Sequence, residues 1–145
     1  MLERLITRVE NYLKYNTYSS VVSLSNKERK KLGEFCLNYC IENVGTHRSK
    51  GNPSVSIVNK KKSYYGEYCN ASQKIYVYYT ECESIGNFIN TFIHEYTHHT
   101  QNLKTYYKIL SKLGYNNHPM EIEANGMAQK YTQQLIESFR KSLNK

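Results

Sequence analysis

Two histidines and a glutamate in the second half of the chain have the types and spacing of a metal site. His94 and His98 are four residues apart, so on a helix both imidazoles lie on one face and can reach one cation. Glu95 follows His94 directly, which places its carboxylate beside that cation. A carboxylate in this position can take a proton from zinc-bound water. The spacing therefore predicts two zinc ligands and one catalytic base.

The flanking residues predict an amphipathic helix that begins at Glu83 or Ser84. Its apolar positions form one stripe at about 100° per residue, made of Ile85, Phe88, Ile89, Phe92, Tyr96 and Leu103. His94 and His98 project on the opposite side, as expected for the wall of a cleft. His99 projects near the apolar stripe, so we expect it to pack there or to support a ligand. The competing interpretation is a surface helix whose histidines are incidental.

A catalytic zinc ion has three protein ligands, so one more must come from another segment. The final predicted helix, Pro119–Leu143, offers Glu121 and Glu123, and His118 lies just before it. The apolar stripe of this helix consists of Ala124, Ala128, Tyr131, Leu135 and Phe139. Glu121 projects onto that stripe and Glu123 away from it. A carboxylate on a buried face is costly unless it is paired or metal-bound, which favours Glu121. Asn125, one turn on, could orient a ligand histidine through a hydrogen bond.

Together these two segments resemble the gluzincin pattern of zinc metallopeptidases, whose third ligand is a Glu on a downstream helix. The matching letters are HEYTH at residues 94–98 and EIEAN at residues 121–125. The Glu-x-x-Ala-Asn form is similar to that of compact repressor-cleaving metallopeptidases of mobile elements and of membrane-embedded prenyl-protein peptidases. Many gluzincins have Asp where this chain has Asn125. The resemblance covers roughly residues 84–130 and implies a minimal zincin-like fold.

The resemblance implies a zinc metalloendopeptidase that hydrolyses protein or peptide substrates, with Glu95 activating the zinc-bound water. It also implies an edge strand that pairs with an extended peptide, and residues 74–79 are the best candidate. An oxyanion would need a hydrogen-bond donor, and several lie on the connection between the ligand helices. These candidates are Tyr106, Tyr107, Tyr115 and His118. His118 could instead cap the final helix.

Other classes of function stay open beside this one. A basic nucleic-acid-binding module with structural zinc is one, because residues 1–62 carry 12 Lys/Arg against 5 Glu. A hybrid would resemble Spartan-like proteases that cleave DNA-bound proteins, although those use a third His. A catalytically inactive zincin acting as an interaction scaffold is another. A metzincin is excluded, because Gln101 and Lys104 stand where that class has Gly and His.

The rest of the chain predicts a single α+β domain over residues 1–145. Helical patterns cover residues 2–15 and the segment from Ser25 to Gly45. The active helix is expected to continue as helix until Gly114. Strands are predicted at residues 54–58, 64–69 and 74–79. The last two flank a turn-like segment, which predicts a hairpin within a small, largely antiparallel three-stranded sheet packed on the active helix.

No apolar run approaches the roughly 20 residues that span a membrane, and the N-terminus lacks a signal-peptide hydrophobic region. We therefore expect a cytoplasmic protein with reduced cysteines and no glycosylation at residues 70–72. Cys36 and Cys40 share a helical face and could bind a second metal. No second cysteine pair accompanies them, so we interpret them as small buried hydrophobic residues.

Overall fold

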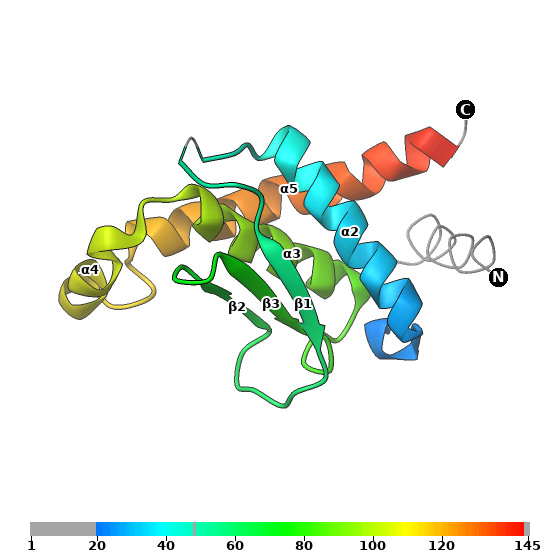
Figure 1. The fold of residues 1–145 in the computed structure, drawn as a ribbon, viewed down its shortest axis with the longest axis horizontal. Helices are drawn as coiled ribbons and strands as arrows, with labels where there is room; N and C mark the ends of the chain where they lie inside the picture. Colours follow the sequence, from blue (N-terminus) through cyan, green and yellow to red (C-terminus); the bar gives the residue numbers. More distant parts are fainter. Residues whose placement is uncertain (1–19, 48, 144–145) are drawn as a thin grey trace.

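A computed structural model describes residues 20–47 and 49–143, so the helix predicted at residues 2–15 lies outside the described residues. The described chain contains four α-helices and a small three-stranded sheet (Figure 1). The helices are α2 (Asn26–Asn43), α3 (Ile85–Thr100), α4 (Tyr106–Leu113) and α5 (Pro119–Leu143). The strands are β1 (Ser54–Val58), β2 (Gly66–Cys69) and β3 (Lys74–Tyr78), and short 3-10 turns occur at Val21–Ser23 and Leu103–Thr105. The predicted α+β class is confirmed.

Helix α3 is the element against which the others pack. It begins where predicted, because the Ser84 hydroxyl accepts a hydrogen bond from the Asn87 amide at 3.1 Å. Its apolar positions are fully buried: Ile85, Phe88, Ile89, Phe92, Ile93 and Tyr96. Strands β2 and β3 contact α3, and α5 and α2 contact it as well (Figure 1). The predicted amphipathic helix is therefore present, with its apolar stripe in the core, except that Leu103 lies beyond the end of α3 in a 3-10 turn and is only partly buried.

The expected helical continuation after α3 is interrupted. Gln101 has extended backbone angles, φ −90° and ψ 157°, and ends α3. The Asn102 side chain then accepts a hydrogen bond from the Lys104 amide at 3.2 Å and starts a 3-10 turn that leads into α4. Asparagine competes for backbone groups in this way, which favours a turn over a continuous helix. Gly114, at φ +75°, ends α4 as predicted.

The sheet is mixed rather than largely antiparallel, which corrects the prediction. Its order is β1-β3-β2, with β2 antiparallel to β3 and β1 parallel to β3. The hairpin predicted between β2 and β3 is confirmed. The chain crosses from β1 to the far side of the sheet through residues 59–65, and β3 then returns to the middle. Strand β3 carries the fully buried Ile75 and Val77, and it is the central strand, hydrogen-bonded along both edges.

The strand order also corrects the choice of an edge strand for peptide pairing. Lys74–Tyr78 is the central strand, and both of its edges are already hydrogen-bonded. The edge strands are β1 and β2, and of these β2 lies against α3. A peptide that adds to this sheet beside α3 would therefore have to pair with β2.

Helix α2 starts at the predicted cap, where Ser25 and Glu28 form a reciprocal capping box. Cys36 and Cys40 are fully buried free thiols within the apolar core, as interpreted from the sequence. Helix α5 places Ala124, Ala128 and Leu135 in the core against α3. In the described part of the chain, no helix combines the length and the apolar character that crossing a membrane requires.

Candidate metal centre

Helices α3 and α5 bring the three predicted ligands together. His94 and His98 lie one turn apart on α3, with their Nε2 atoms 3.2 Å from each other. Glu121, in the first turn of α5, places Oε1 at 3.0 Å from His94 Nε2 and at 2.9 Å from His98 Nε2. The three residues therefore form a buried group that could hold a metal ion.

The spacing of these donor atoms is close to what a zinc ion requires. Histidine nitrogens and carboxylate oxygens bind zinc at about 2.0–2.2 Å, so donors on a tetrahedron lie about 3.3–3.5 Å apart. The observed separations of 2.9–3.2 Å differ from that by only a few tenths of an ångström. Glu121 and His98 are only 4% and 7% exposed, so water competes little for their donor atoms. The ligand types, spacing and burial all fit zinc.

The charges of this group favour an added cation. Burial alone would raise the pKa of Glu121, but hydrogen bonds from His94, His98 and Tyr106 outweigh it and hold that pKa well below its usual range. Burial alone would lower the pKa of His98, but the hydrogen bond and charge of Glu121, together with Glu95, raise it. The cluster of the three side chains thus favours bound positive charge, whether a proton or a metal ion.

Glu95 lies beside the three-residue group without belonging to it. Its Oε1 is 3.9 Å from His94 Nε2, and its side chain is almost fully buried. Burial raises the pKa of Glu95 to about 6, and the neighbouring histidines oppose that shift. A carboxylate near the metal position, with a pKa close to neutral, has the properties of a general base.

Strand β2 approaches Glu95 through a residue that has no side chain. A Cβ atom on Gly66 would lie 3.5 Å from Glu95 Cγ, and only 2.7 Å from both Thr91 Cγ2 and the Tyr76 carbonyl oxygen. Glycine therefore allows the edge strand to pass directly over the part of α3 that carries the base.

Tyr106 is hydrogen-bonded to Glu121, and His118 in turn packs against Tyr106. The Tyr106 hydroxyl donates a hydrogen bond to Glu121 Oε2, the oxygen that points away from the histidines. The Tyr106 ring stacks on His118 at a centroid distance of 4.3 Å. His118 donates from Nε2 to the Tyr106 carbonyl at 3.0 Å, and its Nδ1 accepts from the Met120 amide at 3.1 Å. Both ring nitrogens of His118 are engaged at the start of α5, which favours the capping role over oxyanion stabilisation.

Two other tyrosines from the predicted oxyanion set lie farther out. Tyr107 is 80% exposed on α4, and its ring packs edge-on against the Tyr106 ring. Tyr115 is half exposed, yet partial burial and the charges of Glu121 and Glu95 raise its pKa to about 12. Tyr115 is thus a protonated hydroxyl within electrostatic reach of the centre.

Gln101, to which the sequence analysis gave no role, is hydrogen-bonded to His98. Gln101 Oε1 lies 2.7 Å from His98 Nδ1, whereas Asn125, chosen for this role from the sequence, is exposed on α5. Gln101 directly follows α3 and has an extended backbone, so a helical projection cannot predict the direction of its side chain. Its position three residues after His98 is the signal that could have suggested it.

His99 belongs to a different environment, as its projection toward the core predicted. It is 1% exposed and packs edge-on against the Tyr68 ring of β2. Its Nδ1 lies 2.7 Å from the Tyr68 hydroxyl and its Nε2 lies 2.7 Å from the Gly51 carbonyl. His99 therefore connects α3 to the sheet and to the loop before β1, and both of its ring nitrogens bond to groups outside the cluster of His94, His98 and Glu121.

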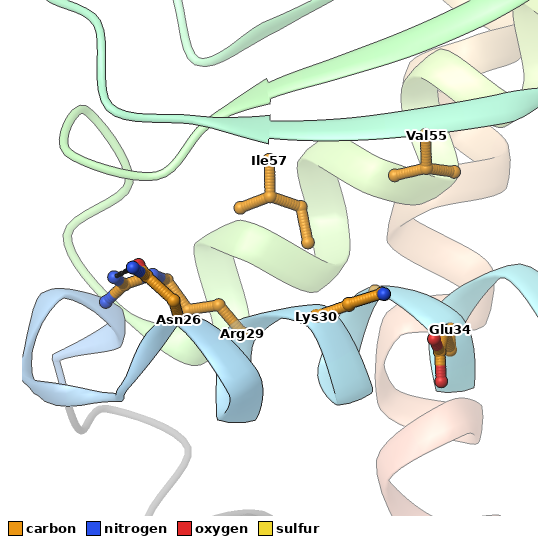
Figure 2. A pocket seen from close by; sticks show the side chains of 7 residues that line it. Asn26, Arg29, Lys30, Glu34, Val55 and Ile57 are labelled. Carbon is orange, nitrogen blue, oxygen red and sulfur yellow. Dashed lines mark hydrogen bonds between the residues drawn. The ribbon is translucent and has the colours of Figure 1, made fainter.

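A pocket of about 430 Å³ lies away from this centre, between α2 and β1 (Figure 2). Val55 and Ile57 point into it from β1, with Lys30 and Glu34 at its rim on α2. Arg29 also lines it, but its guanidinium donates to the carbonyls of residues 21, 22 and 24 and covers the Tyr79 ring at 3.8 Å. With that arginine occupied, the pocket has no converging polar groups comparable to the metal centre.

The metal centre therefore stands out by its chemistry rather than by its volume. It combines three convergent ligand atoms with a separate buried carboxylate. Comparisons with protein-family models, with curated proteins and with solved structures gave no match to this chain.

Proposed function

We propose that this protein is a zinc-dependent metallopeptidase of the gluzincin type. The observation that carries the proposal is the position of Glu95, buried beside the three ligand atoms but outside the group that they form. A structural zinc site is closed by four protein ligands, whereas the described residues supply three here. Three ligands and a free carboxylate are the arrangement expected of a hydrolytic centre.

A zinc ion held by His94, His98 and Glu121 would supply Lewis acidity, which polarises a peptide carbonyl and makes water easier to deprotonate. Glu95 accepts the proton of the attacking water and passes it to the leaving amine. Its pKa of about 6 leaves the carboxylate mostly ionised at neutral pH while keeping proton return possible. Tyr115, half exposed and within electrostatic reach of Glu121 and Glu95, is the hydroxyl that we assign as donor to a developing oxyanion.

The substrate in this proposal is an extended protein or peptide segment that pairs with the outer edge of β2. That edge strand lies on α3, and Gly66 lets its backbone approach Glu95 closely. Backbone hydrogen bonds along an edge strand position a peptide without demanding a particular sequence. The mixed sheet on one side of α3 and α5 on the other support a minimal zincin-like fold.

The test is Glu95→Gln, compared with Glu34→Gln as a matched control on the exposed face of α2. Zinc-loaded protein is incubated with a fluorogenic peptide library, and zinc affinity is measured by competition with a chelator. Glu95→Gln is expected to keep its zinc and to lose about 10²–10⁴ in hydrolysis rate, the usual contribution of a general base. The control should match the wild type in both measurements.

Equal hydrolysis by Glu95→Gln and wild type would contradict the mechanism. Zinc binding without hydrolysis by either protein would instead favour the inactive scaffold or the structural-zinc module.

A further inference from the structure

We propose that Gln101 is a positioning residue that fixes the tautomer of His98 and so leaves His98 Nε2 free to bind the metal. The proposal rests on the metal centre of the proposed function and adds a residue to it. Gln101 is 8% exposed and lies at the end of α3, facing the first turn of α5. Its side chain is the only one among the described residues that is hydrogen-bonded to both His98 and α5.

The orientation of the Gln101 amide follows from its partners on α5. Its Nε2 lies 2.9 Å from the Met120 carbonyl oxygen and 2.9 Å from Glu123 Oε1. A backbone carbonyl and a carboxylate oxygen can only accept hydrogen bonds, so the NH₂ group of Gln101 must face them. The amide oxygen then necessarily faces the opposite way, toward His98.

This orientation determines where the His98 proton lies. Gln101 Oε1 is an acceptor at 2.7 Å from His98 Nδ1, so Nδ1 must carry the hydrogen. His98 Nε2 lies 2.9 Å from Glu121 Oε1, which can also only accept, so without a metal Nε2 donates a hydrogen to that carboxylate. A metal ion would take the place of that hydrogen, while Gln101 keeps the other hydrogen on Nδ1, so Nε2 is the nitrogen directed at the metal. A metal-binding histidine is normally held in the correct tautomer by a partner on its other nitrogen. Here a backbone carbonyl of α5 sets that tautomer through one glutamine side chain.

The same side chain fixes the distance between the two ligand helices. Met120 directly precedes Glu121, so the hydrogen bond to its carbonyl ties the end of α3 to the backbone that carries the third ligand. A loss of Gln101 would therefore affect both the direction of His98 and the position of Glu121. We expect its main consequence to appear in metal affinity rather than in the fold.

The first test replaces Gln101 with Met, which has a similar length and neither amide group. Gln129→Met, on the exposed face of α5, is the control. In zinc-loaded protein, long-range ¹H–¹⁵N spectra report which nitrogen of His98 binds the metal and how fast the hydrogen on the other nitrogen exchanges with water. Wild type and control should bind through Nε2 and show a slowly exchanging Nδ1–H, whereas Gln101→Met should show faster exchange of that hydrogen or binding through Nδ1. Chelator competition should show about 10- to 100-fold weaker zinc binding for Gln101→Met.

The second test exchanges the donor and acceptor roles of the pair. Gln101→Glu alone keeps an acceptor for His98 but places two carboxylates together, so zinc affinity is expected to fall. Adding Glu123→Gln restores an amide donor opposite the new carboxylate. The Met120 carbonyl still faces a carboxylate, so rescue is partial, but the double variant should bind zinc more tightly than Gln101→Glu alone, which loss of packing would not produce.

Zinc bound through Nδ1 of His98 in the wild type would overturn the proposal. Equal zinc affinity and equal exchange of the Nδ1 hydrogen in Gln101→Met and wild type, or no recovery in the double variant, would also overturn it. The spectra and the zinc titration need no substrate, so they decide the role of Gln101 even if the protein proves not to be a peptidase.

Discussion

Two neighbouring histidines at the end of α3 sit in opposite surroundings. His98 faces α5, where Glu121 meets its Nε2 and Gln101 accepts from its Nδ1. His99 faces the sheet, where its Nε2 donates to the Gly51 carbonyl and its Nδ1 accepts from the Tyr68 hydroxyl. Gln101 therefore keeps a hydrogen on Nδ1 of His98, whereas the Gly51 carbonyl keeps a hydrogen on Nε2 of His99.

The two surroundings differ in the charge that they favour on a buried histidine. Anionic Glu121 and Glu95 raise the pKa of His98 against the effect of burial, so positive charge is favoured there. Burial lowers the pKa of His99, Lys50 adds to this effect, and the Gly51 carbonyl opposes it, so the ring stays neutral. Lys50 also donates to the carbonyls of His99 and Gln101 at 3.1 and 3.2 Å, which caps the end of α3. The surroundings of His98 favour positive charge, whereas the contacts of His99 hold α3 to the sheet.

The largest effect is expected from a substitution that changes the surroundings of His98 and leaves those of His99 intact. Glu121→Gln removes an anionic ligand, so zinc affinity should fall by more than the roughly 100-fold that loss of a supporting residue can cost. Glu123→Gln is the matched control and should lose less than about tenfold, because Gln101 keeps its bond to Met120. His118→Ala should also retain a measurable site, since His118 is not in the three-residue group.

Chelator competition on the three variants side by side checks this order. A larger loss in Glu123→Gln or His118→Ala than in Glu121→Gln would refute the assignment of the third ligand.

The next largest effect is expected from a substitution that removes a hydrogen bond of His99 and leaves the proposed metal ligands unchanged. Tyr68→Phe removes the donor to the buried His99 Nδ1, and an unsatisfied buried acceptor costs about 1–3 kcal/mol. Urea denaturation should report that loss in the free energy of unfolding, with zinc affinity unchanged. Tyr65→Phe, at a 48% exposed position, is the control and should stay within about 0.5 kcal/mol. A fall in zinc affinity for Tyr68→Phe would show that the two regions are coupled.

A third, smaller effect sharpens the description of the ligand side. Tyr106→Phe removes the hydrogen bond to Glu121 Oε2 but keeps the ring that stacks on His118. Zinc affinity should fall about tenfold, the lower end of the range for residues that orient a ligand. Tyr107→Phe, on an exposed ring, should have no effect. Equal affinities for the two variants would mean that Glu121 does not depend on Tyr106 for its orientation.

The smallest effect concerns Asn125, which the sequence suggested as a partner of a ligand histidine. Because Asn125 is exposed, Asn125→Ala should change neither zinc affinity nor stability by more than about 0.5 kcal/mol. Zinc titration and thermal unfolding check this. A clear loss of zinc affinity would assign to Asn125 the positioning role that we propose for Gln101.

The sequence alone determined the features that repeat at helical spacing or depend on near neighbours. The His94–His98 pair, the apolar stripe of α3 and the preference for Glu121 over Glu123 all follow from about 3.6 residues per turn. The cap at Ser84 follows from the next three residues. These predictions agree with the structure because each depends on a single helix.

Tertiary structure decided what depends on contacts between segments. Alternation predicted the strand at residues 74–79 but not its central place, which follows from the burial of Ile75 and Val77 and from the path of the chain around β3. The partner of His98 is Gln101 because the end of α3 meets the start of α5. No periodicity within one segment specifies which group another segment brings beside it. That is why both ligand helices could be predicted from the sequence, whereas the hydrogen bonds that join them could not.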